Sequence, residues 1–254
     1  MCVLFFAHRR HSRYPLVFAG NRDEAYDRPA APAAWWTDAP HVLAGRDLEA
    51  GGTWLGVTTA GRWAVVTNVR DLTRLRDGAR SRGDLVRGFL VGEETAEAFA
   101  QRTFDARDAY NPFNLIVGDA DAVWYVSTHE DRPTELVPGL YGLSNSTLGV
   151  AWPKVERGLA AFERLLAEEP LQPEPFLALL HDDTRPSDEA LPDTGVGLER
   201  ERMLSALFIA SERYGTRAST VLLLDEGGGG RFVERTFGPG GVEGETCAFA
   251  FGPS

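Results

Sequence analysis

Short apolar runs dominate this sequence and most restrict the folds open to it. The runs are rich in β-branched and aromatic residues and are bounded by Gly, Pro, Asp and Asn, the pattern of β-strands. Three pairs of runs are joined by brief polar turns, so each pair predicts a β-hairpin. The hairpins are expected at residues 3–7 with 16–19, 53–58 with 62–67, and 113–118 with 123–128. Further strands are expected at residues 141–144, 219–224, 231–237 and 246–251.

Helical periodicity appears between these groups of strands. The clearest helix is expected at residues 154–167, where apolar residues form one stripe: Val155, Leu159, Phe162, Leu165 and Leu166. Further helices are expected at residues 84–90, 94–104, 174–180 and 199–210, and residues 182–197 form a loop rich in Asp, Pro and Gly. The pattern predicts an α+β fold with two antiparallel sheets and helices packed outside. No repeat or linker divides the chain, so residues 1–254 are expected to form a single domain.

Charge and cysteine content exclude several classes of protein. The chain of 254 residues has 26 basic and 37 acidic residues, a net charge of −11, which disfavours binding to nucleic acids or anionic membranes. The two cysteines, Cys2 and Cys247, lack metal-ligand spacing and indicate a reducing compartment. No apolar run has the roughly 20 residues that span a membrane, and the apolar start is too short for a signal peptide. We therefore expect a soluble, cytoplasmic protein.

Cys2 is the first candidate for chemistry. The initiator Met is generally removed before a small second residue, which would leave the Cys2 thiol beside its own α-amine. An amine with an ordinary pKa of about 7.7–8.0 can act as the base for that nucleophile. The alternative is a small buried residue that begins a strand.

Other candidates are polar residues at the ends of predicted strands. Arg22 and Asp23 follow the second strand, and Arg217 precedes a later one. Asn68 and Asn145 each end a strand, where their amides can serve as oxyanion donors. Taken singly, each residue is better explained by a turn or a solvated surface. The histidines form no ligand-like cluster, so no metal site is expected.

Motifs along the whole chain resemble those of the NRDE family, which includes the transport and Golgi organisation 2 group. The family takes its name from the tetrapeptide at residues 21–24. The matching motifs are Met1-Cys2, Asn21-Arg-Asp-Glu24, Arg28-Pro29, Trp35-Trp36, Gly45-Arg-Asp47, Gly51-Gly-Thr-Trp-Leu-Gly56, Thr67-Asn68, Ser81-Arg-Gly83, Asn114-Leu115, Leu143-Ser-Asn145, Trp152-Pro-Lys154 and Tyr214-Gly-Thr-Arg217 with Thr220.

A second resemblance is to N-terminal nucleophile (Ntn) hydrolases of the choloylglycine and penicillin V acylase type. It implies an αββα sandwich of two antiparallel sheets flanked by helices. It also implies a catalytic set, which falls here on Cys2, Asp23, Asn68, Asn145 and Arg217. The early arginine departs from the acylase pattern. In the acylases this arginine stands further before the aspartate, whereas Arg22 is adjacent to Asp23. Adjacent strand residues point to opposite faces, so Arg22 is expected to point away from the thiol.

These resemblances leave two functions open, besides that of a scaffold protein that has kept the fold and lost the chemistry. In the first, Cys2 attacks the carbonyl of a small amide or thioester substrate, and the chain is a hydrolase without a cofactor. In the second, the chain is a non-catalytic carrier or chaperone for haem or an acyl lipid, as the association of the family with haem and acyl-CoA homeostasis implies. The apolar wall of its binding site would then come from Trp35, Trp36, Trp54 and Trp63.

Overall fold

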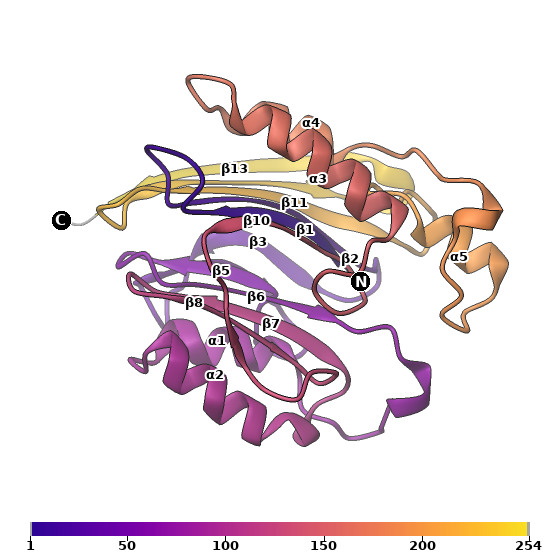
Figure 1. Ribbon diagram of the computed structural model, residues 1–254, viewed down its shortest axis with the longest axis horizontal. Helices are drawn as coiled ribbons and strands as arrows, with labels where there is room; N and C mark the ends of the chain where they lie inside the picture. The colour runs from indigo at the N-terminus through magenta and orange to yellow at the C-terminus, as the bar shows by residue number, and fades with distance from the viewer. Residues whose placement is uncertain (1, 253–254) are drawn as a thin grey trace. The chain divides into compact units, whose positions relative to one another are not determined.

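The computed structural model describes residues 2–252, and its chain divides into two compact units (Figure 1). Unit 1 comprises residues 1–27, 138–223 and 231–249, and unit 2 comprises residues 28–137, 224–230 and 250–254. Each unit contains its own β-sheet. The expectation of a single domain stays a prediction.

Unit 1 is built on a six-stranded sheet with the strand order β10-β1-β2-β11-β12-β13. The strands are β1 (Cys2–His8), β2 (Leu16–Ala25), β10 (Gly139–Leu143), β11 (Tyr214–Leu224), β12 (Gly230–Phe237) and β13 (Glu243–Phe251). The helices of this unit are α3 (Pro153–Leu166), α4 (Pro173–Leu180) and α5 (Leu198–Leu204). Helices α3 and α4 lie over one face of the sheet (Figure 1).

Alternation along β1 decides which side chains meet these helices. Val3, Phe5 and Ala7 belong to the hydrophobic core that also contains Phe162 of α3 and Phe176 of α4. The rings of Phe5 and Phe162 are 6.1 Å apart between centroids. The even-numbered residues of β1, beginning with Cys2, therefore lie on the opposite face of the sheet.

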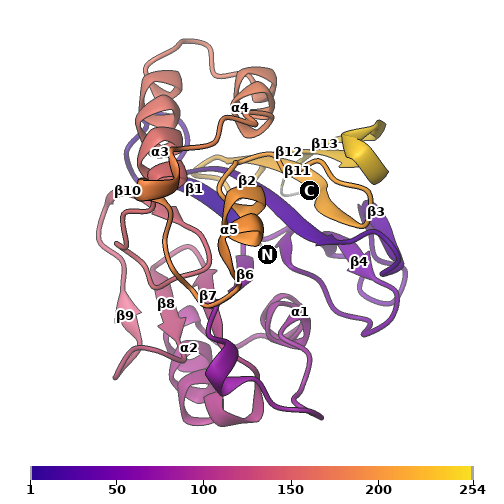
Figure 2. The same ribbon diagram turned by 90° about the vertical axis from the view of Figure 1, so that its right-hand side faces the viewer.

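Unit 2 contains a seven-stranded sheet in which each strand pairs with the next along the chain. The strands are β3 (Ala30–Trp35), β4 (Val42–Asp47), β5 (Leu55–Thr58), β6 (Trp63–Asn68), β7 (Phe113–Gly118), β8 (Val123–Ser127) and β9 (Thr134–Glu135). Helices α1 (Gly83–Val91) and α2 (Ala96–Asp105) come between β6 and β7 and cover one face of this sheet (Figure 2). Their core includes Phe89 and Phe99, whose rings meet edge to face at 5.2 Å.

The expected α+β class with two antiparallel sheets is confirmed, and the three expected hairpins are present. Strands β3 and β4 were not expected. The β3 sequence is mostly alanine and contains Pro32, which is compatible with its place at the sheet edge but conceals its strand pattern. The helix expected at residues 199–210 was too long, since α5 ends at Leu204.

Among the described residues, no helix is long and apolar enough to cross a membrane. The same part of the chain holds no group of three or more His, Cys, Asp or Glu side chains arranged to bind a metal ion.

Candidate active site

The candidate nucleophile, Cys2, is the first residue of β1 and is 7% exposed. It is a free thiol and pairs with Arg22 in the register of β1 and β2. Directly opposed residues of an antiparallel pair project to the same face of the sheet. The expectation that Arg22 points away from the thiol was therefore wrong, because the hairpin register, which the spacing did not reveal, puts both residues on one face.

Asp23 lies one residue further along β2, on the helix-covered face, and is 1% exposed. The Thr216 hydroxyl donates a hydrogen bond of 2.8 Å to its Oδ1 atom. The Tyr214 hydroxyl donates to its backbone carbonyl at 3.2 Å. Burial raises the pKa of Asp23, against the opposing effects of the positive N-terminus and of Lys154. A buried carboxyl with nearby positive charge can hold an ammonium group or accept a proton.

The surroundings of the Cys2 thiol both raise and lower its pKa. Burial raises the pKa of Cys2 above the ordinary cysteine value. The positive N-terminus, Arg22 and the backbone N–H of Asp23 lower it, while the Asp23 carboxylate raises it. The reactive thiolate thus depends on neighbouring positive charge to offset its burial.

Asn145 follows β10, the strand on the other side of β1, and is 1% exposed. Ser144 connects it to the nucleophile: the Ser144 hydroxyl lies 3.1 Å from the Cys2 carbonyl oxygen and 3.3 Å from Asn145 Oδ1. Strand pairing between β1 and β10 therefore brings Asn145 to the same end of the sheet as Cys2.

Arg217 lies on β11, the neighbour of β2, and is half-buried. Its guanidinium donates a hydrogen bond of 2.8 Å to the Ala25 carbonyl and lies 5.7 Å from the centre of the Tyr26 ring. Burial, together with the nearby charge of Arg22, lowers the pKa of Arg217. Two arginines are thus close to each other at the edge of the candidate site, which favours an anionic group there.

Asn21, the first residue of the tetrapeptide at residues 21–24, has a structural role. Its amide Nδ2 donates to the carbonyls of Leu180 at 2.8 Å and Leu207 at 2.9 Å, and its Oδ1 accepts from Ser219 at 2.6 Å. The side chain is fully buried. It ties β2 to the end of α4, to the segment after α5 and to β11.

The remaining candidates belong to unit 2. Asn68 ends β6, as expected, and pairs with Phe113 of β7. Trp36, Trp54 and Trp63 are 4%, 8% and 2% exposed, and Trp35 is half-buried with its ring edge to face with that of Phe251. The Trp36 indole donates to the Ala44 carbonyl within the unit 2 core.

Three residues near Cys2 and Asp23 were missed as site candidates: Ser144, Lys154 and Thr216. Lys154 begins α3, is 2% exposed and donates from Nζ to the Leu204 carbonyl at 2.8 Å. A lone lysine at the start of an apolar helical stripe was the available signal for it. Ser144 and Thr216 gave no comparable signal, because small hydroxyl residues are common in strands and turns.

Comparison with known proteins places these features in a family context. A family model described as Transport and Golgi organisation 2 matches residues 1–239. The chain is 36% identical to the Transport and Golgi organization protein 2 homolog of Bos taurus and 34% identical to that of Homo sapiens, each alignment covering 93% of both chains.

One similar solved structure is that of a mutant conjugated bile acid hydrolase from Clostridium perfringens. It aligns with a TM-score of 0.53 and 9% sequence identity, over 98% of this chain and 92% of that one. At such low identity the likeness concerns the fold alone, which is that of an Ntn hydrolase. The expected fold type is confirmed on this ground.

Proposed function

We propose a function for this chain from the premise that it belongs to the Transport and Golgi organisation 2 family, whose model matches residues 1–239. The chain is a hydrolase of small amide or thioester substrates, and Cys2 is its nucleophile. The observation that carries this proposal is the pairing of Cys2 with Arg22 at the start of a buried strand, with the buried carboxyl of Asp23 next along the chain. Removal of Met1, which lies outside the described residues, provides the α-amine.

The first chemical step forms an acyl-enzyme. The Cys2 thiol transfers its proton to the α-amine, and Sγ attacks the substrate carbonyl carbon to give a tetrahedral oxyanion. Collapse of this intermediate breaks the bond to the leaving nitrogen or sulfur, which takes up the proton from the amine. Asp23 orients the α-amine and balances its positive charge.

The second step is hydrolysis of the acyl-enzyme. Water gives one proton to the α-amine and attacks the thioester carbonyl. Collapse of the tetrahedral intermediate releases the carboxylic acid and the Cys2 thiolate, which takes the proton back from the α-amine. Asn145 supplies an amide donor for the oxyanion in both steps, and Arg22 and Arg217 stabilise negative charge near the sulfur. The oxyanion role expected for Asn68 stays a prediction of the sequence. Loss of one oxyanion donor costs about 10²–10³ in rate in enzymes of this kind.

The carrier for haem or an acyl lipid is the alternative. The word Transport in the relatives' names is compatible with this alternative, but that name belongs to those proteins. Of the tryptophans assigned to its binding wall, Trp36, Trp54 and Trp63 are buried. The hydrolase is therefore better supported by the geometry. A cytoplasmic location stays a prediction of the sequence.

The test begins with the intact mass of the purified protein, which shows whether Met1 has been removed. The processed protein is then assayed with a panel of N-acyl amides and acyl thioesters. We expect activity that Cys2→Ala abolishes and that Cys247→Ala, the control at the second free thiol, leaves unchanged. A covalent acyl group on Cys2 by mass spectrometry would identify the intermediate.

Two results would contradict the proposal. Full activity in Cys2→Ala would show that Cys2 is not the nucleophile. Quantitative retention of Met1 would leave the mechanism without its base. Titration with haem and with a fatty acyl thioester then tests the carrier. A saturable Soret shift that is lost on substitution of Trp35 by Ala would favour that alternative.

A further inference from the structure

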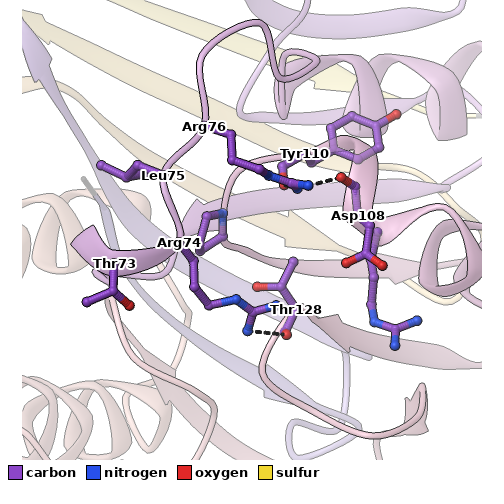
Figure 3. A pocket seen from close by; sticks show the side chains of 9 residues that line it. Thr73, Arg74, Leu75, Arg76, Asp108, Tyr110 and Thr128 are labelled. Carbon is purple, nitrogen blue, oxygen red and sulfur yellow. Dashed lines mark hydrogen bonds between the residues drawn. The ribbon is translucent and has the colours of Figure 1, made fainter.

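Unit 2 contains a pocket of about 240 Å³ whose lining includes three arginines (Figure 3 shows Arg74 and Arg76). Arg74 and Arg76 come from the segment after β6, and Arg107 comes from the segment after α2. Asp108, Tyr110 and Thr128 also line it. None of these residues was singled out by the sequence patterns, and none belongs to the candidate active site.

Backbone carbonyls hold the three guanidinium groups in place. Arg74 donates to the Thr128 carbonyl at 3.1 Å, and Arg76 donates to the carbonyls of Asp108 and Tyr110 (Figure 3). Arg107 donates to the Phe104 carbonyl at 2.8 Å and lies 3.9 Å from the centre of the Phe104 ring. A guanidinium carries five N–H donors, so each retains donors for a ligand after these bonds are made.

The charge of the pocket contrasts with that of the chain. Three arginines and one aspartate give the lining a formal charge of +2, in a protein with a net charge of −11. Guanidinium forks match the geometry of phosphate and carboxylate oxygens. One carboxylate supplies a single negative charge, whereas a phosphate monoester carries about −1.5 to −2 at pH 7 and offers three oxygens.

We propose that this pocket binds the phosphate group of a small organic phosphate. Its volume of about 240 Å³ is below the roughly 300–1,000 Å³ of sites that enclose a drug-sized ligand. It therefore takes the phosphate and leaves the organic part of the ligand outside. Leu75 lines the pocket, is 52% exposed and offers that part an apolar contact.

The proposal is tested by calorimetric titration of the full chain at low ionic strength with phenyl phosphate, benzoate and inorganic phosphate. Phenyl phosphate and benzoate share a ring and differ in the anionic group. We expect saturable binding of both phosphates, with phenyl phosphate at least tenfold tighter than benzoate and weakened by added salt. Equal affinity for benzoate, or no saturable binding of either phosphate at millimolar concentration, would overturn the proposal.

Variants identify the site. Arg74→Gln removes one guanidinium, and Arg107→Lys keeps the charge but removes the fork, so we expect each to weaken phenyl phosphate binding about tenfold or more. Arg132→Gln removes an exposed arginine outside the pocket lining and is the matched control. Circular dichroism confirms that each variant is folded. Equal weakening by Arg132→Gln would show a general charge effect and overturn the site.

Two further measurements distinguish a lipid phosphate from a soluble one, and phosphate binding from hydrolysis at Cys2. Sedimentation with phosphatidylcholine vesicles, with and without phosphatidic acid, distinguishes a lipid headgroup from a soluble ester, and the net charge of −11 favours the soluble ester. Cys2→Ala should bind phenyl phosphate with unchanged affinity, because the pocket uses residues of unit 2 alone. Failure of phosphate binding would thus leave the hydrolase proposal intact, and loss of hydrolysis would leave the pocket intact.

Discussion

At the scale of single residues, the candidate site depends on which strand face each side chain occupies. Register puts Cys2 opposite Arg22, while Asp23 enters the helix-covered face and meets Thr216. The sequence suggested most of these residues, because polar groups at strand ends are conspicuous. It could not assign their faces, since register depends on hairpin pairing across β1 and β2. Lys154 was missed as a site candidate for a related reason: its burial follows from the docking of α3.

Arg22 should control the ionisation of the Cys2 thiol. Its positive charge lowers the Cys2 pKa against the effect of burial, so Arg22→Gln should move that pKa upward. At a fixed pH near 8, alkylation by iodoacetamide should become several-fold slower, and the rate profile should shift to higher pH. Mass spectrometry of Cys2 in a Cys247→Ser background measures this. Arg10→Gln, at an exposed position in the turn between β1 and β2, should leave the profile unchanged.

Asp47 should make a pH-dependent contribution to the free energy of unfolding. Although burial raises the pKa of Asp47, hydrogen bonds from Arg28 at 2.6 Å and from the backbone N–H groups of Ala50 and Glu49 hold it below its ordinary value. A carboxyl whose pKa is lower in the folded than in the unfolded state stabilises the fold at pH values above its unfolded pKa of about 3.9. This stabilisation is lost as the pH falls through the folded-state pKa.

The test is Asp47→Asn, which keeps the shape of the side chain and removes its charge. We expect a loss of about 1 kcal/mol at pH 7, kept small because the ion pair is partly exposed to solvent. In urea unfolding curves the loss should stay constant down to about pH 5 and shrink as the pH falls below about 4. Asp77→Asn, at an exposed loop position, is the control. A pH-independent loss would show that the charge of Asp47 is not the cause.

At the scale of elements, the helix expected at residues 154–167 matches α3, and all five residues of the predicted stripe lie in the core of unit 1 or pack against it. The buried residues of α3 are Lys154, Val155, Gly158 and Phe162, whereas Leu165 and Leu166 of the predicted stripe are only partly buried. Gly158 permits the helix to approach β1 closely, because a Cβ there would collide with the Phe5 ring. A glycine inside a helix carries no hydrophobic signal, so periodicity alone could not identify this contact.

Two glycine substitutions should therefore have opposite effects on stability. Gly158→Ala should lower the free energy of unfolding by about 1–3 kcal/mol through overpacking against Phe5, despite the better helix propensity of alanine. Gly88→Ala on α1 should raise it by about 0.5–1 kcal/mol, since its Cβ would lie 3.7 Å from Phe99, an ordinary contact. Thermal and urea unfolding measure both. Equal effects of the two changes would contradict the close packing of α3 on β1.

At the scale of the whole molecule, the two units are formed by different parts of the sequence. Strands β3 to β9 and helices α1 and α2 all lie within the continuous stretch of residues 28–137, whereas unit 1 requires segments from both ends of the sequence. Such connectivity is invisible to local patterns, which showed hairpins and helices but not how the strands are shared between two sheets. A sheet with its two helices, all built from one continuous stretch of chain, suggests a separable domain, but the apolar residues on both faces of this sheet argue against that.

The seven-stranded sheet is apolar on both faces, and this should make the fragment 28–137 unstable alone. Val42 and Ala44 belong to the core under α1 and α2, whereas Leu43, Val65 and Ile116 lie outside that core, at positions of β4, β6 and β7 that alternate with it. In the fragment the helix-free face would meet water, and an exposed apolar face of this kind favours association.

We therefore expect the fragment to keep β-sheet circular dichroism but to bind the dye ANS several-fold more strongly than the full chain and to aggregate. The full chain should unfold in one cooperative transition, with tryptophan fluorescence and far-UV circular dichroism coincident. A monomeric fragment that unfolds cooperatively, together with two transitions in the full chain, would instead divide residues 1–254 into two domains. Because phosphate binding is proposed for residues of unit 2 alone, titrating the fragment with phenyl phosphate would then show whether that domain keeps its ligand.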